Sequence, residues 1–376
     1  MINRYLQSAI ESYLPQKKVS LLVGARRTGK TELLKAIYRD FAGPKLWWNG
    51  EDYTVNQMLE QPSLEAYKRL VGDAQLLIID EASYLPEITQ KAKLMIDHIA
   101  PLHIILSGSS SFDLVQVGAP LVGRSRVFEL YSLAQCELRA VENRIETAQQ
   151  LESRLLYGSY PELWQIDSPR EKEKYLTDLV QSYLLKDILQ FEQIRNAQKL
   201  SDLLQLVAHQ IGQEVSLEEI GRQLGLSKNT VERYMDLLEK AFVVFPLSGY
   251  SRNLRKEVVK SKKWYFFDNG IRNAVLRDFS PIAVRSDKGA LWEQYLLNEL
   301  KKNNQRLDKD ARFHFWRTYD QQELDIIEVC GNQMRAFECK WNPEAKVKIP
   351  KAFANAYPEA SFHILHAHSY LDFVEA

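Results

Sequence analysis

The chain is short of several features, and each shortage argues against a class of protein. Cysteine is scarce: three residues (Cys136, Cys330 and Cys339), odd in number and without metal-ligand spacing, predict reduced and mostly buried thiols. No run approaches the roughly 18 apolar residues that a membrane span needs. The first residues carry no apolar stretch typical of a signal peptide. Together these absences predict a cytoplasmic protein without a membrane segment.

Net charge is also missing. The 49 Lys/Arg residues balance the 49 Asp/Glu residues, so overall charge does not attract the molecule to nucleic acid, and any basic surface must be local. The chain of 376 residues is longer than a domain with a single hydrophobic core usually is, which predicts two or three domains.

Apolar runs alternate with helical patterns over roughly the first 135 residues, which predicts a parallel α/β sheet with helices on both faces. The expected strands are Val19–Val23, Leu46–Trp48, Leu76–Ile79, His103–Leu106 and Val127–Leu130. From about Leu151 the pattern becomes helical. The last hundred or so residues combine a helix, Leu291–Leu300, with short strands, which is an α+β pattern.

A phosphate-binding loop follows the first expected strand. The spacing G-x-x-x-x-G-K-[ST] is matched by Gly24, Ala25, Arg26, Arg27, Thr28, Gly29, Lys30 and Thr31. Glycines let backbone N–H groups point at phosphate oxygens, and the following helix start adds a positive dipole end. Lys30 is expected to reach the β- and γ-phosphates, and the Thr31 hydroxyl to ligate Mg²⁺. The loop therefore predicts ATP and Mg²⁺ as ligands.

Two acids end the apolar run Leu76–Ile79. Asp80 would hold Mg²⁺, usually through water, and Glu81 would orient and deprotonate the attacking water. Acids after a strand also commonly cap the next helix. Their position, about 50 residues after the phosphate loop, favours the magnesium site.

Two further polar segments have open interpretations. Ser107 and Ser109 follow the next strand and either contact the γ-phosphate and attacking water or form local turn bonds. Arg124, with Arg126 as a weaker candidate, either reaches the γ-phosphate of a neighbouring subunit in a homo-oligomer or is an exposed or ion-paired arginine.

These motifs together resemble a widespread bacterial and archaeal family of AAA+ ATPases with a C-terminal domain of unknown function. The resemblance covers about residues 3 to 345. It rests on Gly24–Thr31, Leu76–Glu81, Ser107–Ser110, Gly123-Arg124, Leu130–Leu133 with Glu137, Gly158–Glu162 and Trp264–Gly270. It implies an ASCE-type P-loop domain, then a winged helix, then a nuclease-like domain. Asn49–Asp52 departs from the Asp-rich turn usual in that family.

Residues Ser216–Ser227 resemble a helix-turn-helix. Ser216 and Ser227 can each cap a helix, and Gly225 suits the turn between them. The second helix would expose Lys228, Asn229, Glu232 and Arg233. Residues 248–263 add the basic residues Arg252, Arg255, Lys256, Lys260, Lys262 and Lys263, against one acid, Glu257. This region either contacts DNA or is a packing module with its charges in solvent.

Asp325 and Glu338 lie on adjacent expected strands, and Lys340 shares the face of Glu338 because side chains alternate along a strand. Two carboxylates can hold a second Mg²⁺ while the ammonium acts on a water. This resembles the PD-(D/E)xK nuclease pattern, with Glu293 as its helical acid. The alternatives are a surface Glu–Lys pair and an inactive fold of the same kind.

The expected fold is therefore an α/β P-loop domain followed by a helical and winged-helix region and a restriction-endonuclease-like α+β domain. The expected domains are 1–145 (AAA+ ATPase), 146–210 (helical), 211–270 (winged-helix-like) and 271–376 (nuclease-like). The favoured function is an ATP-driven switch. Its rivals are a nucleotide-gated nuclease and a non-hydrolysing ATP-binding module that controls a protein partner.

Overall fold

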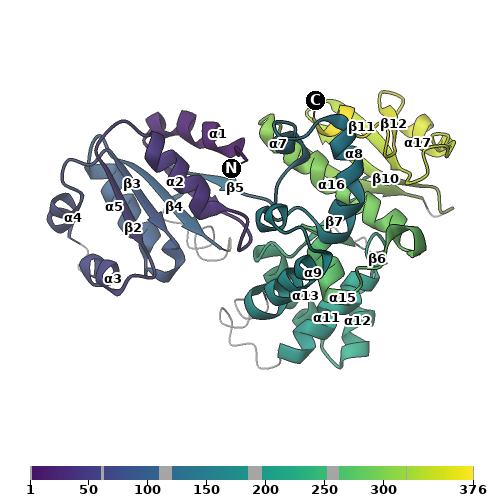
Figure 1. Ribbon diagram of the computed structural model, residues 1–376, viewed down its shortest axis with the longest axis horizontal. Helices are drawn as coiled ribbons and strands as arrows, with labels where there is room; N and C mark the ends of the chain where they lie inside the picture. The colour runs from purple at the N-terminus through teal and green to yellow at the C-terminus, as the bar shows by residue number, and fades with distance from the viewer. Residues whose placement is uncertain are drawn as a thin grey trace. The chain divides into compact units, whose positions relative to one another are not determined.

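The computed structural model describes residues 2–60, 63–109, 121–184, 197–251, 262–318 and 320–375. The chain forms two compact units, which are described separately (Figure 1). Unit 1 is Met1–Ser132 with Lys240–Phe242, and unit 2 is Leu133–Glu239 with Val243–Ala376. In the described ranges, no helix is long and apolar enough to cross a bilayer.

Five parallel strands form the sheet of unit 1, in the order β2-β3-β4-β1-β5. Their bounds are β1 Val19–Val23, β2 Lys45–Asn49, β3 Leu76–Asp80, β4 His103–Gly108 and β5 Ser125–Glu129. β1 and β3 are buried along their whole length. Continuous Val, Leu and Ile runs suit parallel strands that are covered on both faces. The parallel sheet expected from the sequence is confirmed.

Strand order brings three functional segments to one edge. β4 lies between β1 and β3, paired with β1 up to Val23 and Gly108 and with β3 up to Ile79 and Leu106. Because the strands are parallel, the residues that follow them meet at the carboxyl edge, where ligands bind in open α/β sheets. The phosphate loop, Asp80-Glu81 and Ser107 are therefore neighbours.

Helices cover both faces of this sheet. Leu22, Ile78 and Ile105 share a hydrophobic cluster with α1 (Leu6–Tyr13) and α2 (Lys30–Asp40). α5 (Ile88–His98) contacts β1 and β4 but contributes no described residue to that cluster, so it covers the other face. The other helices of unit 1 in the described ranges are η1 Leu14–Gln16, α3 Tyr53–Leu59, α4 Leu64–Val71 and η2 Ala82–Tyr84.

Unit 2 contains a mixed sheet in the order β12-β11-β10-β9-β7-β8-β6. Its strands are β6 Glu214–Val215, β7 Val244–Gly249, β8 Lys262–Phe266, β9 Ala311–Arg317, β10 Glu323–Cys330, β11 Gln333–Cys339 and β12 Ser361–Leu365. β9, β10 and β11 pair antiparallel, whereas β7 pairs antiparallel with β8 and parallel with β9. The β7–β9 pairing makes one sheet of strands that lie far apart in the sequence.

The structure describes the following helices of unit 2, several of which contact the sheet. They are α7 Gln135–Leu138, α8 Arg144–Tyr157, η4 Pro161–Gln165, α9 Pro169–Asp178, η5 Leu179–Leu184, α11 Ala197–His209, α12 Leu217–Leu224, α13 Lys228–Lys240, α15 Asn269–Leu276, η6 Ile282–Val284, α16 Lys288–Arg306, α17 Lys351–Ala356 and α18 Leu371–Val374. The predicted helix Leu291–Leu300 is confirmed within the longer α16.

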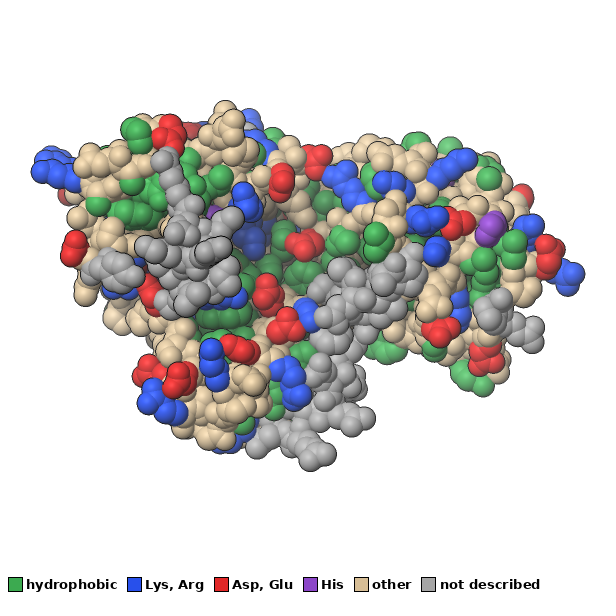
Figure 2. Space-filling view, turned by 180° about the vertical axis from the view of Figure 1, so that it is seen from behind, with side chains coloured by type: hydrophobic (Ala, Val, Ile, Leu, Met, Phe, Trp, Pro, Cys, Tyr) green, Lys and Arg blue, Asp and Glu red, His purple; other side chains and the backbone are tan. Residues whose placement is uncertain are grey.

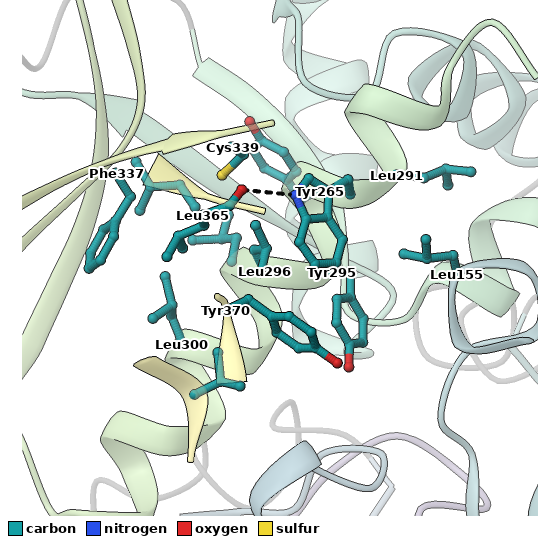
Figure 3. Packing of buried hydrophobic residues seen from close by; sticks show 14 of the residues in the cluster. Leu155, Tyr265, Leu291, Tyr295, Leu296, Leu300, Phe337, Cys339, Leu365 and Tyr370 are labelled. Carbon is teal, nitrogen blue, oxygen red and sulfur yellow. Dashed lines mark hydrogen bonds between the residues drawn. The ribbon is translucent and has the colours of Figure 1, made fainter. Parts of the chain in front are cut away.

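Packing of α16 against the sheet forms the main core of unit 2. The buried Trp292 donates its indole N–H to the carbonyl oxygen of Leu365 at 3.1 Å, the dashed line in Figure 3. Tyr295 stacks on Trp292 with ring centroids 5.8 Å apart. Leu296 and Leu300 extend the same apolar stripe at helical spacing. This core fixes α16, and with it Glu293, beside the sheet.

Candidate active site

The segment between β1 and α2 is the one that the sequence predicts to be a phosphate loop. Gly24 packs against the residue after β5, where a Cβ atom would lie 2.3 Å from the carbonyl oxygen of Leu130. Gly29 has φ 96° and Arg27 has φ 64°, so the chain turns sharply before α2. α2 begins at Lys30 with no side-chain cap bond. Its first-turn N–H groups are therefore available to an anion in the loop.

Lys30 and Thr31 carry functional side chains at the start of α2. The buried Lys30 ammonium donates to the carbonyl oxygens of Gly24 at 2.9 Å and Ala25 at 3.0 Å. It therefore lies inside the curl of the loop, where a P-loop lysine reaches phosphates. The Thr31 hydroxyl donates to Asp80 Oδ2 at 2.8 Å. This contact joins the phosphate loop to the acidic end of β3.

Ser107 links the two acids to β4. Its hydroxyl donates to Asp80 Oδ1 and accepts from the backbone N–H of Glu81 at 3.0 Å. Ser109 is buried one residue beyond the end of β4. Of the two serines considered from the sequence, Ser107 is the one that contacts Asp80 and Glu81.

Glu81 is held in an unusual environment. Its backbone has φ 50°, a left-handed conformation that is rare for a residue with a side chain. Its Oε2 atom is buried and has no hydrogen-bond partner among the described residues. Burial, helped by Asp80, raises the pKa of Glu81, although Lys30 and Arg26 pull that pKa down. A carboxylate with an open oxygen beside two cations suits a base that acts on water.

These residues fit Mg²⁺ and a triphosphate. A side chain at position 24 would collide with the backbone of Leu130, so the loop needs glycine there. The Lys30 ammonium lies inside the loop, and the Thr31 hydroxyl contacts Asp80. The open Oε2 of Glu81 supplies the acceptor that a water would use. Thr31 and Asp80 would hold the metal, directly or through water.

Comparison with known families agrees with this geometry. Residues 16–139 match the family model described as AAA domain. This match and the five-stranded parallel sheet support an AAA-type P-loop ATPase fold for the N-terminal unit. Residues 148–281 and 288–371 match two models described as domains of unknown function (DUF8612 and DUF4143).

Two relatives that match most of the chain are named as uncharacterised proteins. A Mycobacterium tuberculosis protein is 28% identical over 331 residues, covering 87% of this chain and 71% of the relative. A Methanocaldococcus jannaschii protein is 22% identical over 347 residues, covering 85% of this chain and 76% of the relative. The structure of a Walker-type ATPase of Pyrococcus abyssi has TM-score 0.50 and 15% identity, over 73% of this chain and 96% of that one. That likeness supports the fold.

Three contacts in the AAA domain were not foreseen from the sequence. Arg4 donates to the carbonyl oxygen of Thr28 in the phosphate loop at 2.7 Å and to that of Tyr131 at 2.6 Å. Arg26 donates to the Tyr84 hydroxyl at 3.2 Å. Neither Arg4 nor Tyr84 belongs to a motif, and each partner is distant in sequence, so no local pattern could have identified them.

Arg124 lies away from this site in its own chain. It directly precedes β5, and its carbonyl oxygen accepts from the N–H of Val19, the first residue of β1. That position is the amino edge of the sheet, opposite the phosphate loop. Its guanidinium pairs with Asp97 of α5 at 2.7 Å. Arg124 therefore does not join Lys30 and Glu81 within one chain of the AAA domain.

Unit 2 brings together the acids predicted near the C-terminus. The β9–β10 register shifts between Leu324 and Ile327, and such a bulge re-aims the side chains within it. Asp325 lies in the bulge and accepts from the N–H of Cys339 at 2.7 Å. Glu338 pairs with Lys340 at 2.6 Å, as alternation along a strand predicts. Its Oε2 atom is buried without a hydrogen-bond partner among described residues.

Glu293 of α16 approaches the same acids. It accepts from the Tyr265 hydroxyl and lies 3.8 Å from the ammonium of Lys263. Lys263 is buried and also pairs with Glu323, a contact that sequence reasoning missed. Burial, then repulsion from Asp325, raises the pKa of Glu293 well above its ordinary range.

Burial also raises the pKa values of Asp325 and Glu338. These three carboxyl groups come from different elements, and their raised pKa values mean that ionisation is unfavourable. A further cation bound between them would stabilise their ionised forms. Within the described ranges, however, no three His, Cys, Asp or Glu side chains are arranged as a ready metal site.

The helix-turn-helix pattern corresponds to α12 and α13. Ser216 caps α12 by accepting from the N–H of Glu219, Ser227 caps α13 by accepting from the N–H of Thr230, and Gly225 takes the left-handed conformation between them. The core face of α13 is buried as predicted (Val231, Tyr234, Met235 and Leu238). On the other face Lys228 pairs with Glu232 at 3.4 Å. Arg252, Arg255, Lys256 and Lys260 lie outside the described residues.

Proposed function

We propose that this protein binds ATP with Mg²⁺ and hydrolyses it to ADP and phosphate. The carrying observation is the 2.8 Å contact between Thr31 and Asp80, beside a Glu81 carboxyl whose Oε2 has no hydrogen-bond partner among the described residues. The phosphate loop, the proposed magnesium ligands and the proposed base therefore lie together at one edge of the sheet. Phosphoryl transfer to water requires such an arrangement.

The chain's own groups have distinct tasks in this reaction. Loop N–H groups and Lys30 hold the β- and γ-phosphates, and bound Mg²⁺ would neutralise part of their charge. Glu81 accepts a proton from the attacking water while the oxygen of that water bonds to the γ-phosphorus. The bond from that phosphorus to the bridging oxygen breaks, and ADP carries the electron pair away. Ser107 positions Asp80 and the backbone of Glu81 through its two hydrogen bonds.

We further propose that the nucleotide state acts as a switch on unit 2. Support comes from the link between the phosphate loop and the segment that leads out of the AAA domain. Gly24 packs on Leu130, and Arg4 donates to both Thr28 and Tyr131. A shift of the loop on nucleotide binding would therefore displace Leu130 and Tyr131, directly before unit 2 begins at Leu133.

An ATPase assay with and without DNA, on wild type and Lys30→Ala, tests the proposal. We expect phosphate release by wild type and its loss in Lys30→Ala, because the ammonium is the cation that contacts the phosphates. Glu338→Ala, in unit 2, serves as the matched control and should keep its activity. Tight ATP retention without turnover would instead indicate the non-hydrolysing module, and no nucleotide uptake in calorimetry would refute both.

A second candidate is Mg²⁺-dependent DNA cleavage by unit 2. It is favoured by the buried Oε2 of Glu338, which has no hydrogen-bond partner among the described residues and lies near Asp325 and Lys340. Asp325 and Glu338 would hold the metal, which would supply charge to the scissile phosphate, while Lys340 orients the water. On the face in Figure 2, acidic and basic side chains of the described residues are interspersed. DNA contact is proposed for the exposed face of α13 and for the basic stretch without Lys263, because Lys263 is buried and paired with Glu323.

Nicking of supercoiled DNA tests this candidate. We expect Mg²⁺-dependent nicking by wild type that is lost in Asp325→Ala, because one of two metal-binding carboxylates is gone. Asp372→Ala, which removes an exposed acid paired with Arg144, is the control and should nick normally. Equal nicking by Asp325→Ala and wild type would point to a contaminating nuclease.

A further inference from the structure

We propose that Arg26 is a catalytic residue that neutralises the γ-phosphate in cis, from the same chain that holds the nucleotide. This inference rests on the proposed ATPase function and assigns one residue to it. In the structure the guanidinium of Arg26 rests on the Tyr84 hydroxyl, 3.2 Å away. Tyr84 ends η2, the short helix that starts directly after Glu81. The side chain thus reaches from the phosphate loop to the segment that carries the base.

Loop geometry brings the guanidinium near the reacting groups. Arg26 belongs to the loop that curls around the Lys30 ammonium, and its guanidinium contacts Tyr84, three residues after Glu81. Lys30 grips the β- and γ-phosphates in a P-loop, and Glu81 acts on a water that attacks the γ-phosphorus. The γ-phosphate must therefore lie between Lys30 and Glu81. A guanidinium that starts on the same loop and contacts the segment directly after Glu81 is within reach of that phosphate.

Tyr84 contacts the guanidinium in this structure. Its side chain is half-exposed, and its contact with the guanidinium is a hydrogen bond rather than an ion pair. A phosphate oxygen forms a charge-assisted bond with arginine and can accept two N–H groups at once. The guanidinium is therefore expected to leave Tyr84 when ATP fills the loop and to return after phosphate release.

The position of Arg124 bears on whether one chain can complete its own site. Arg124 pairs with Asp97 at the amino edge of the sheet, so it can serve only the site of another copy. If Arg26 supplies the guanidinium instead, each chain completes its own site. Hydrolysis per chain would then be independent of protein concentration, whereas a shared site needs association.

Single-turnover hydrolysis and nucleotide affinity separate these possibilities. The variants are Arg26→Ala, Arg26→Lys, Tyr84→Phe and Arg124→Ala, with Arg39→Ala as the control, because Arg39 is an exposed arginine of α2 paired with Asp40. We expect Arg26→Ala to slow hydrolysis on the order of a thousandfold. Its ADP affinity should stay within about twofold, and binding of ADP with aluminium fluoride should weaken strongly, because that complex mimics the transferring phosphoryl group.

The remaining variants make the assignment specific. Arg26→Lys should recover only part of the rate, since an ammonium lacks the guanidinium fork. Tyr84→Phe and Arg124→Ala should hydrolyse at nearly the wild-type rate at every protein concentration. A wild-type rate in Arg26→Ala, equal losses of ADP and ATP binding, or a rate that rises with concentration and vanishes in Arg124→Ala would each overturn the inference. Absence of ATP binding in wild type would instead refute the proposed function itself.

Discussion

Glu81 has an environment that is costly for an ionised side chain. Its carboxyl is removed from water and adjoins Asp80, and both effects oppose ionisation; Lys30 and Arg26 offset part of the cost. The positive φ of its backbone adds strain. Strain and desolvation at one residue are typical of groups that act in chemistry, because packing alone would favour a relaxed apolar residue at this place.

The raised pKa predicts where activity is lost in acid. A raised pKa means that Glu81 keeps its proton to higher pH than an ordinary glutamate near about 4.3. The base is therefore disabled at pH values where exposed glutamates are still ionised, and activity should rise as pH increases through the raised value. The profile of kcat/KM against pH measures this in the free enzyme. A flat profile down to the ordinary glutamate range, with ATP still bound, would contradict the assignment.

At the scale of elements, parallel pairing and one bulge determine which side chains meet. β4 between β1 and β3 sets Ser107 against Asp80 and Glu81. In unit 2, the β10 bulge turns Asp325 into the cluster that Glu293 enters from α16. The position of Glu293 depends on α16, which the Trp292 core fixes to the sheet.

The Trp292 core predicts a large local effect on stability. Trp292→Ala removes a fully buried ring and its bond to Leu365, and should lower the free energy of unfolding of unit 2 by about 3–5 kcal/mol. Trp164→Ala, at a side chain that is 44% exposed, is the matched control and should cost less than about 1 kcal/mol. Denaturant unfolding measures both, and nucleotide binding by the AAA domain should persist in each. Similar losses for the two variants would show that α16 is not a central support.

At the scale of the whole molecule, two compact units divide the chemistry. The AAA domain contains the phosphate loop and its acids, and unit 2 contains a separate cluster of charged groups around Asp325. The balance of 49 basic and 49 acidic residues leaves no net charge to steer an anionic partner. Recognition of any nucleic acid must therefore depend on local groups. The proposed control of unit 2 by nucleotide depends on the link through Arg4, Thr28 and Tyr131.

The amino-acid sequence by itself determined the phosphate loop, the acids after β3 and the parallel sheet. Each is a local pattern that can be recognised from residues close together in the chain. The patterns are a fixed spacing of Gly, Lys and Thr, and apolar runs, one of which ends in Asp-Glu. Tertiary structure alone decided that Ser107 rather than Ser109 meets Asp80, that Arg124 lies at the far edge, and that Arg4, Tyr84 and Lys263 contact the functional groups. Those contacts join residues far apart in the chain, and strand order and helix packing set them, which no local spacing encodes.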